Sequence, residues 1–329
     1  MSDEWRKLGD RIRNWGRWGR DDQLGTLNLI TPEIRARAAK LAKTGKVFSL
    51  AIPLNGDSPM GAHGLRRPPV HLMAVDGGDE NLATRVTDWR DARQQEVGPV
   101  YETAPFRTND DWIFMAVQSS TQWDALCHAY YDGTMYNGVP AGASTSFGVM
   151  RDAIDVVADV APVAGRGVLL DAARHRGVAS LEAGTVVQPE ELDDIATAQG
   201  VTLRQGDIVV VRTGWWPKYA EYGVGNGPAW QADGPGLGWR TAGWLFDHDV
   251  AAIASDNVAV EPAVPREGIV LPLHMLTLRD MGLMLGELWD LERLAADCAE
   301  DGVYEFFLSA PPLKITGGTG SPINPIAMK

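Results

Sequence analysis

The sequence predicts a single α/β domain with a mixed sheet, extending over residues 1–329. Short apolar runs rich in β-branched residues alternate with helical segments from the first third of the chain to its end. No low-complexity linker or internal repeat divides these elements. Hydrophobic residues make up 45% and charged residues 22%, the balance of an ordinary folded globular protein.

The first helix is predicted in the segment LITPEIRARAAKLAKTGKV. Thr31 is a good N-cap, Pro32 suits the first helical position, and Glu33 favours the first turn. Gly45 can end this helix, and the segment KVFSLAIPL that follows it predicts a strand.

Residues 53–79 are rich in Gly and Pro, which predicts an irregular arm that covers a surface or a partner subunit. Residues 1–80 therefore contain the N-terminal helix and this arm, within the one domain. His71 lies in the arm, either as a loop residue or in the wall of a substrate pocket.

The remaining elements follow from periodicity and from Gly and Pro boundaries. Residues 110–126 predict one long β segment, and residues 222–239 predict a glycine-dense loop suited to a lid or pocket wall. Further strands are predicted in GRGVLLDAAR, GDIVVVRTGW, VAAIASD, LMLGEL and YEFFLSAPPLKI. Further helices are predicted in PEELDDIATAQG, RTAGWLFDHD, PLHMLTLRDMG and WDLERLAADCA.

Composition excludes several classes of function. A net charge of −13 argues against nucleic acid or an anionic membrane as the main partner. Only two cysteines, Cys127 and Cys298, fit a reducing cytoplasm better than a disulfide framework. The charged N-terminus lacks the apolar core of a signal peptide, and no run is long enough to span a membrane. We therefore expect a cytoplasmic protein that acts on a small molecule.

Common catalytic motifs are absent. The GPGLG run lacks the preceding strand and following acidic residue of a dinucleotide site, and GGTGSP lacks the Lys-Ser/Thr of a phosphate loop. No Gly-x-Ser-x-Gly elbow occurs. Cys127 and His128 are adjacent, so on an extended chain they point to opposite faces and make a poor nucleophile pair.

The segment QSSTQWDALCH, from Gln118 to His128, concentrates polar residues between apolar ones. On a strand, Gln118, Gln122 and Asp124 share one face, and His128 follows just after it. Such alternation is also typical of a solvated edge strand, and taken alone this plainer interpretation is favoured.

A second polar pair strengthens the functional interpretation. His274 begins the HMLTLRDMG helix and Glu287 ends the strand after it. A helix that packs antiparallel to the next strand brings its start near the end of that strand, so the two residues can meet. With Asp124 between them, they suggest a carboxylate–histidine metal site. Singly, His274 could bond only to backbone, and Glu287 could only cap the next helix.

These residues resemble the cyclase family of metal-dependent hydrolases, which includes bacterial kynurenine formamidases and isatin hydrolases. The family signature is similar to H-x-G-T-H-x-D-x-P-x-H, and QSSTQWDALCH occupies its place here. The segments ASDNVAVEP, LPLHMLTLRDMGLMLGELWDL, GDIVVVRTGW and GGTGSPINPIA are also typical of the family. The resemblance implies a swivelling β/β/α fold, with a barrel-like mixed sheet flanked by helices, and a homodimer or homotetramer.

Carried over by position, the resemblance implies that Asp124, His274 and Glu287 are metal ligands and His128 is the general acid/base. Gln118 and Gln122 replace the first two histidine ligands of the family. An amide oxygen binds zinc poorly but suits harder ions such as Mn²⁺. The divalent metal is therefore Mn²⁺ or Zn²⁺, held by the three ligands with Gln122 assisting or by the full oxygen-rich set, or it is absent.

The mechanism implied is hydrolysis of a small amide, cyclic amide or lactone by metal-activated water, with His128 and Asp124 in catalytic roles. Trp123, Trp215 and His71 are candidates for substrate contacts, although Trp123 should point away from the face of Asp124. Two alternatives stay open: a ligand-binding protein that has lost catalysis, and a metal-free lyase or cyclase that uses Asp124 and His128.

Overall fold

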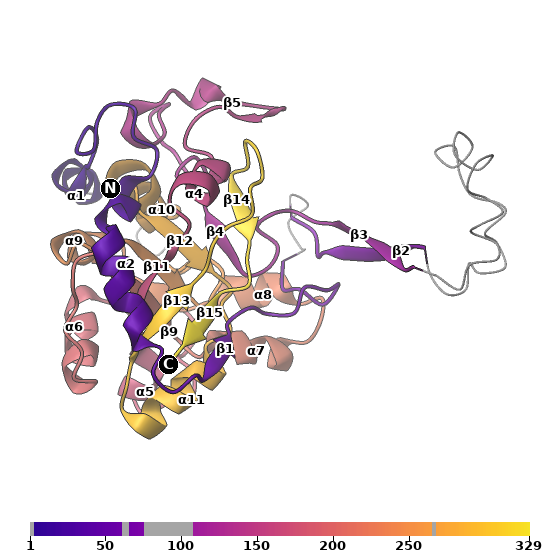
Figure 1. Ribbon diagram of the computed structural model, residues 1–329, viewed down its shortest axis with the longest axis vertical. Coiled ribbons are helices and arrows are strands. Elements are labelled where there is room, and N and C mark those ends of the chain that lie inside the picture. The colour runs from indigo at the N-terminus through magenta and orange to yellow at the C-terminus, as the bar shows by residue number, and fades with distance from the viewer. Residues whose placement is uncertain (1–2, 61–65, 76–107, 265–267) are drawn as a thin grey trace.

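The computed structural model describes residues 3–60, 66–75, 108–264 and 268–329. Its centre is a nine-stranded sheet that curls into a half-barrel flanked by helices (Figure 1). The α/β fold with a mixed barrel-like sheet is thus confirmed. The strand order is β1 (Val47–Ser49), β15 (Ile326–Met328), β13 (Glu305–Ser309), β7 (Ala164–Asp171), β9 (Ile208–Arg212), β11 (Ala252–Ser255), β12 (Met284–Glu287), β4 (Gln122–Asp124) and β14 (Gly320–Pro322).

The four central strands β7, β9, β11 and β12 run parallel, and antiparallel strands extend the sheet on both sides. Their residues are almost all buried, as expected for parallel strands covered on both faces. The helices are α1 (Glu4–Ile12), α2 (Pro32–Ala38), α4 (Ile154–Val160), α5 (Ala172–His175), α6 (Pro189–Ala198), α7 (Trp215–Tyr222), α8 (Gly227–Ala232), α9 (Thr241–Asp247), α10 (Pro272–His274) and α11 (Glu292–Asp301), with a π-helix η6 (Met275–Met281) after α10.

The N-terminal cap of α2 is as predicted, but the helix is shorter than expected. The Thr31 hydroxyl accepts a hydrogen bond from the backbone N–H of Ile34. The helix ends at Ala38, and a 3₁₀ turn continues it to Leu41 rather than to Gly45. The reason is tertiary, because the backbone N–H groups of Thr44 and Gly45 both donate to the carbonyl of Lys329, at the end of the sheet.

The prediction of one long β segment over residues 110–126 is wrong. The segment forms two strands, β3 (Asp110–Phe114) and β4, which a turn separates. β3 pairs with β2 (Val70–Val75) in a hairpin that projects from the body, whereas β4 lies in the main sheet between β12 and β14 (Figure 1). An alternating pattern cannot reveal this break, because it does not show which partner each half pairs with.

Two other predicted irregular regions contain regular elements. Part of the arm at residues 53–79 forms β2, while residues 61–65 and 76–79 lie outside the described part of the chain. The glycine-dense segment 222–239 holds α8 and the short strand β10 (Gly236–Leu237), which pairs with β8 (Val186–Val187). A further small hairpin joins β5 (Ser144–Thr145) to β6 (Gly148–Val149). Within the described ranges, none of the helices is long and apolar enough to cross a bilayer.

Candidate metal centre

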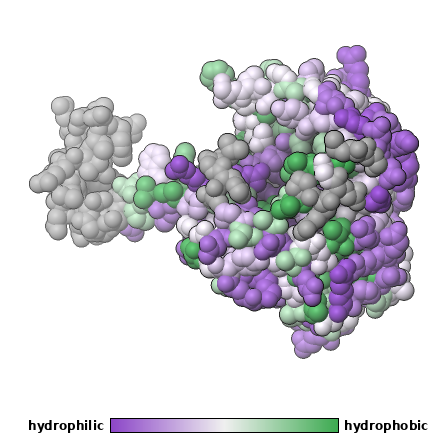
Figure 2. Space-filling view, turned by 180° about the vertical axis from the view of Figure 1, so that it is seen from behind, coloured by the Kyte–Doolittle hydropathy of each residue, from purple (hydrophilic) through white to green (hydrophobic). Residues whose placement is uncertain are grey.

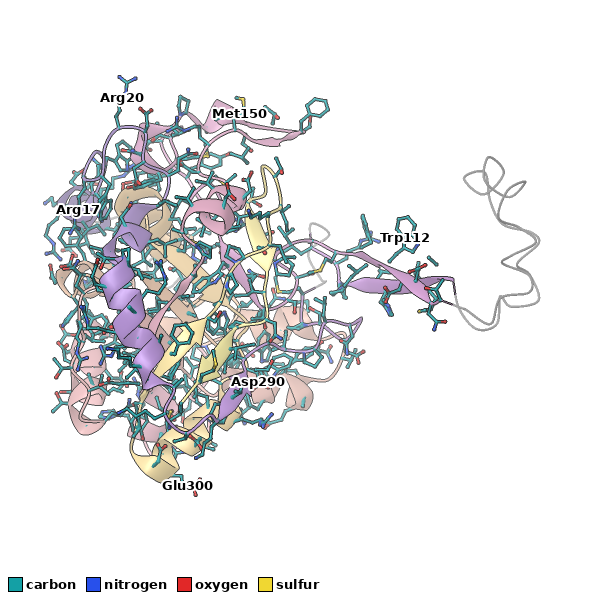
Figure 3. All side chains as sticks on the ribbon, in the orientation of Figure 1. Arg17, Arg20, Trp112, Met150, Asp290 and Glu300 are labelled. Carbon is teal, nitrogen blue, oxygen red and sulfur yellow. The ribbon has the colours of Figure 1, made fainter. Side chains whose placement is uncertain are left out.

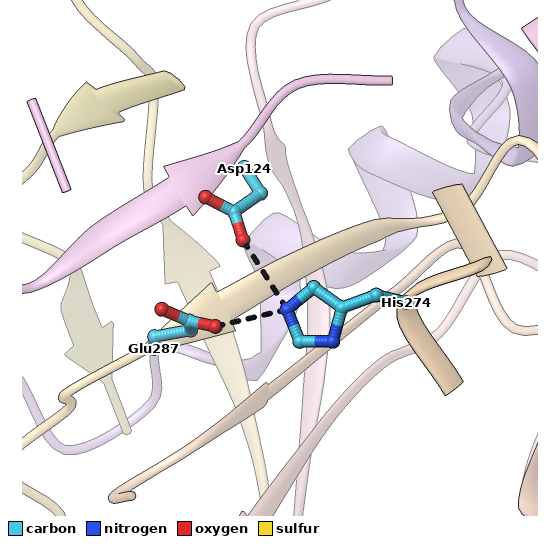
Figure 4. Close-up of side chains that lie close together, drawn as sticks. All are labelled: Asp124, His274 and Glu287. Atoms are coloured by element: carbon cyan, nitrogen blue, oxygen red, sulfur yellow. Dashed lines mark hydrogen bonds and ion pairs between the residues drawn. The ribbon is translucent and has the colours of Figure 1, made fainter. Parts of the chain in front are cut away.

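Two antiparallel strands and one short helix assemble a buried cluster of polar groups. β4 pairs with β12 so that Gln122 lies opposite Glu287 and Asp124 opposite Leu285. Because alternate residues share a face, Gln122, Asp124 and Glu287 lie on one side of the sheet. α10 places His274 over the same point (Figure 4).

The distances within the cluster are short enough for a shared ion. His274 Nε2 lies 3.3 Å from Glu287 Oε1 and 3.8 Å from Asp124 Oδ2. One ligand atom from each of Asp124, His274 and Glu287 lies within 4.8 Å of the others, and all three side chains are buried. The arrangement brings together groups that are 150 positions apart in the sequence.

Several oxygens of this cluster lack a hydrogen-bond partner. Both carboxylate oxygens of Asp124 are buried and unpaired, and so is the amide oxygen of Gln122. The Gln122 amide nitrogen donates to Glu287 Oε2 at 2.5 Å, and the Gln122 amide oxygen takes no part in this bond. Buried polar atoms are almost always satisfied in folded proteins, so these three oxygens, grouped with His274 and Glu287, fit a cation as their partner.

The pKa values of Asp124 and His274 also fit a site for a cation. Burial, opposed by His128 and His274 and reinforced by Glu287, raises the pKa of Asp124 to about 6. Burial lowers the pKa of His274, but hydrogen bonds to Glu261 and Glu287 outweigh it and raise that pKa to about 10. The cluster therefore holds protons tightly, and a divalent cation could take their place.

Glu261 completes the surroundings of His274, and the sequence analysis did not identify it. Its Oε1 lies 2.8 Å from His274 Nδ1 and accepts from the His274 backbone N–H at 2.9 Å, while Oε2 accepts from the N–H of Leu273. The residue stands in the ASDNVAVEP segment, but one carboxylate after a strand gives no signal of its partner.

His128 lies at the edge of the cluster, partly buried. Its Nε2 is 3.8 Å from Asp124 Oδ1 and 3.3 Å from Nη2 of Arg66, and the Gln118 amide nitrogen lies 3.4 Å from Nδ1. Burial lowers the pKa of His128 against the opposing charge of Asp124, and the Arg66 guanidinium lowers it further. Its environment thus favours the neutral imidazole that a general base requires.

Gln118 does not contact the carboxylates, contrary to the expectation of a shared strand face. Residues 118–121 precede β4 and are not extended. The Gln118 amide donates to Thr319 at 3.0 Å and lies beside His128, where Gly320 leaves room for it: a Cβ there would approach the amide nitrogen to 2.8 Å. This places Gln118 beside His128 rather than beside Asp124, His274 and Glu287.

The three predicted substrate-contact residues lie apart from the cluster. Trp123 points to the opposite face of β4, is fully buried, stacks edge-on against Trp289, and donates to the carbonyl of Ala310. Trp215 is buried at the start of α7, and its indole N–H donates to Trp230. His71 is exposed on the projecting hairpin, paired with Asp111 at 2.7 Å. Both tryptophans pack in the interior, and a contact of these three residues with a substrate stays a prediction.

Comparison with known proteins identifies relatives of this arrangement. The family model described as "Putative cyclase" matches residues 48–262. A crystal structure of a novel cyclase is 41% identical, with a TM-score of 0.86, over 98% of this chain and 99% of that one. No curated protein matches the chain in sequence.

More distant structures share the fold alone. Isatin hydrolase A from Labrenzia aggregata, bound to benzyl benzoate, is 17% identical with a TM-score of 0.59, over 90% of this chain and 97% of that one. A structure from Bacillus stearothermophilus, described as a predicted metal-dependent hydrolase, is 14% identical with a TM-score of 0.50, over 87% and 98% of the two chains.

Proposed function

Because this chain belongs to the cyclase family, we propose that it is a metal-dependent hydrolase of a small amide, cyclic amide or lactone. The observation that supports this most directly is the set of orphaned buried oxygens beside His274 Nε2. The distant structures with hydrolase names share the fold and agree with this class of reaction.

The residues present fit a divalent cation. Asp124, His274 and Glu287 would hold it, with the free amide oxygen of Gln122 beside them. Two carboxylates and a neutral imidazole carry a charge of −2, which a divalent ion balances. Three oxygen-bearing side chains and one nitrogen favour Mn²⁺ over Zn²⁺. When bound, the ion would supply an acidic water at neutral pH and polarise the carbonyl of the substrate.

The neighbouring side chains move the proton. Hydrolysis forms a new C–O bond to the carbonyl carbon and breaks the C–N or C–O bond of the amide or lactone. His128, whose pKa is lowered, takes the proton of the attacking water and returns it to the departing nitrogen or oxygen. Arg66, 3.3 Å from His128, offers its positive charge to the carboxylate that the reaction produces.

A second candidate function rests on the Asp124–His128 distance of 3.8 Å. This pair could act as an acid and a base without a metal, in a lyase or cyclase. The two functions differ in their response to chelation, because only the hydrolase depends on an ion at the cluster.

The test combines metal analysis with activity. Protein purified without chelator should contain about one divalent ion per chain, and it should hydrolyse members of a panel of cyclic amides, lactones and N-formyl amines. Dialysis against EDTA should abolish turnover, and Mn²⁺ should restore it. The variants Glu287→Gln and exposed Glu182→Gln form a matched pair, and only the first should lose the ion. Activity that survives chelation would instead support the metal-free alternative.

We also propose that the chain is a homo-oligomer joined through the β2–β3 hairpin. Residues opposite each other in the hairpin share a face, and one face carries the pairs Val70–Phe114 and Leu72–Trp112. These four side chains are 47%, 81%, 62% and 69% exposed, in that order. Trp112 stands out from the ribbon of the hairpin (Figure 3), and hydrophobic residues are exposed on the hairpin (Figure 2).

The apolar area suits a symmetric contact. Met73 and Ile113 on the other face are also about half exposed. The four side chains on the first face alone offer on the order of 500 Å² per chain, so two copies that pair through it bury on the order of 1,000 Å², about the minimum for a specific interface. A two-stranded hairpin is marginally stable alone in water, which favours a partner surface.

Light scattering on the purified protein tests the oligomer. The double variant Leu72→Ser/Phe114→Ser should shift the particle from dimer or tetramer to monomer. Val303→Ser, an exposed apolar residue outside the hairpin, should leave the mass unchanged. A monomeric wild-type protein at micromolar concentration would contradict the proposal.

A further inference from the structure

Three apolar residues with strained backbone lie next to the candidate metal centre in the chain. Among the described residues, seven that are not glycine have a left-handed φ: Asp132, Asn137, Asp152, Asp249, Val260, Leu271 and Leu288. Asp and Asn tolerate this conformation, but a branched apolar side chain does not. The three apolar exceptions, Val260, Leu271 and Leu288, stand out because such strain persists only where the surrounding structure imposes it.

Each of these three residues flanks a group of the cluster. Val260, with φ 60°, immediately precedes Glu261, and Leu288, with φ 58°, immediately follows Glu287. Leu271, with φ 47°, is the N-cap residue of α10, the short helix that ends at His274. The strained positions therefore fix the direction in which Glu261, His274 and Glu287 leave the backbone.

Asn257 links two of the strained turns. Its Oδ1 accepts from the backbone N–H of Val260 at 2.7 Å, and its Nδ2 donates to the Val260 carbonyl at 3.2 Å. Its own carbonyl accepts from the N–H of Leu288 at 2.8 Å. Asn257 is buried, and its hydrogen bonds all go to backbone groups, none of them to the ligand atoms of Asp124, His274 or Glu287.

The strained turn at Val260 positions the carboxylate of Glu261 at the start of α10. α10 has no side-chain cap of its own, and the Glu261 carboxylate instead accepts the first N–H groups of that helix, from Leu273 and His274. The same carboxylate binds His274 Nδ1 at 2.8 Å. The ring is thereby held with Nδ1 as the donor and with Nε2 directed at Asp124 and Glu287.

We propose that Glu261 and Asn257 form a positioning unit for His274, in which Glu261 fixes the ring and its Nδ1 proton while Asn257 fixes the strained turns. The inference rests on the proposed function for the importance of Nε2, but the hydrogen bond it invokes belongs to the protein itself. Neither residue touches the proposed ion, so both act through His274 and Glu287.

The test compares two buried acidic residues that both accept backbone N–H groups. Asp256 accepts from Thr213, Gly214 and Trp215 at the start of α7 and contacts no histidine. The variants Glu261→Gln and Asp256→Asn should both lower Tm. Only Glu261→Gln should weaken Mn²⁺ binding, by about 10- to 100-fold in a chelator competition.

A spectroscopic measurement separates the two roles of Glu261, which are to hold the His274 ring and to accept the first N–H groups of α10. In the metal-free protein, proton NMR should show the His274 Nδ1–H as a downfield resonance protected from exchange. It should persist in Asp256→Asn and shift or disappear in Glu261→Gln. Asn257→Ala should lower the affinity for Mn²⁺ by about 10-fold although Asn257 touches no ligand atom.

The outcomes are distinct from those of the proposed function. If no metal binds but the Nδ1–H resonance depends on Glu261, the positioning unit stands and the metal-dependent hydrolase fails. If Mn²⁺ binds equally to the wild type and Glu261→Gln, the positioning unit is wrong. Should Glu261→Gln not fold, the wild-type spectrum decides, because the absence of a protected Nδ1–H resonance would overturn the inference.

Discussion

Two buried charged clusters in the same sheet are organised in opposite ways. At the ends of β7 and β9, Arg212 donates to Asp171 at 2.9 Å and to both oxygens of Glu292 at 2.8 Å. At the ends of β4 and β12, Asp124 and Glu287 meet His274, and both oxygens of Asp124 stay without a hydrogen bond. The first cluster pairs its carboxylates with a guanidinium through short hydrogen bonds, whereas the second, among the described residues, offers Asp124 only histidine nitrogens at 3.8 Å.

We interpret the difference as that between a structural ion network and the metal site proposed above. Burying charges costs free energy that only good pairing offsets, so a network built for stability is expected to be satisfied. A buried carboxylate without a hydrogen bond is neutralised by a proton or gains a cation. Asp152, whose oxygens are also unpartnered, is not joined by a second carboxylate and a histidine, as Asp124 is, within the described part of the chain. The following predictions test this contrast, from the largest expected effect to the smallest.

Replacing the unpaired carboxylate should abolish activity without harming the fold. Asp124→Asn keeps the size of the side chain and removes a buried charge, so kcat/KM should fall by more than about 100-fold. The free energy of unfolding of the metal-free protein should stay within about 1 kcal/mol of the wild type or rise. Chemical denaturation and steady-state kinetics check both parts. A large loss of stability would show that Asp124 is structural.

Breaking the satisfied network should have the reverse effect. Arg212→Met leaves Asp171 and Glu292 without their main partner, so the free energy of unfolding should fall by about 3 kcal/mol. Arg176→Met is the surface control, since its pair with Glu191 is more exposed and should contribute less than about 1 kcal/mol. Metal affinity of the folded Arg212→Met protein should equal that of the wild type. Urea titration and metal competition provide the measurements.

Metal binding should strengthen as the pH rises. The pKa of Asp124 is raised from 3.8 to about 6, so below pH 6 a proton competes with the ion. Affinity for Mn²⁺ should fall about tenfold for each pH unit below 6, from this group alone. In the metal-free protein, the stability that Asp124 contributes changes in the opposite direction and falls as the pH rises. The folded state keeps a proton that the unfolded chain releases, so stability from Asp124 is lost between pH 3.8 and about 6. Calorimetry at pH 5 and pH 7 measures both.

Restoring an imidazole should change metal preference more than activity. Gln122 occupies a histidine position of the family signature, and its amide oxygen is free in the cluster. Gln122→His replaces a hard oxygen with a nitrogen, so the ratio of Zn²⁺ to Mn²⁺ affinity should rise by about tenfold. Gln118→His is the matched control, because Gln118 contacts Thr319 and His128 rather than the carboxylates. An equal shift in both variants would mean that Gln118 also binds the ion.

Local signals in the sequence predicted the buried central strands and several helices, but not α1, α4 or α7. Pro189 marked the start of α6, and consecutive β-branched residues marked the buried strand β9. The prediction failed where distant contacts set the boundary, as at Gly45, where the carbonyl of Lys329 draws the chain away from the helix. It failed again at residues 110–126, where the two halves of the segment pair with different strands.

The candidate site was predicted in part for the same reason. Asp124, His274 and Glu287 were identified by residue type and by family resemblance, and the structure brings them together. Gln118 was placed on the wrong face because the strand begins only at Gln122. Glu261 was missed because its role depends on a hydrogen bond to a histidine thirteen positions later, across a turn.

The sequence by itself determined the residue types at the site, the buried parallel strands and the excess of acidic residues. Those properties depend on local chemistry, which each residue carries with it. The tertiary structure decided which carboxylates are paired and which are not. Arg212 satisfies Asp171 because β7 and β9 are neighbours, whereas the strands beside Asp124 bring no cation. Charge compensation acts between atoms a few ångströms apart, so only the folded chain shows which buried charge needs a partner from outside.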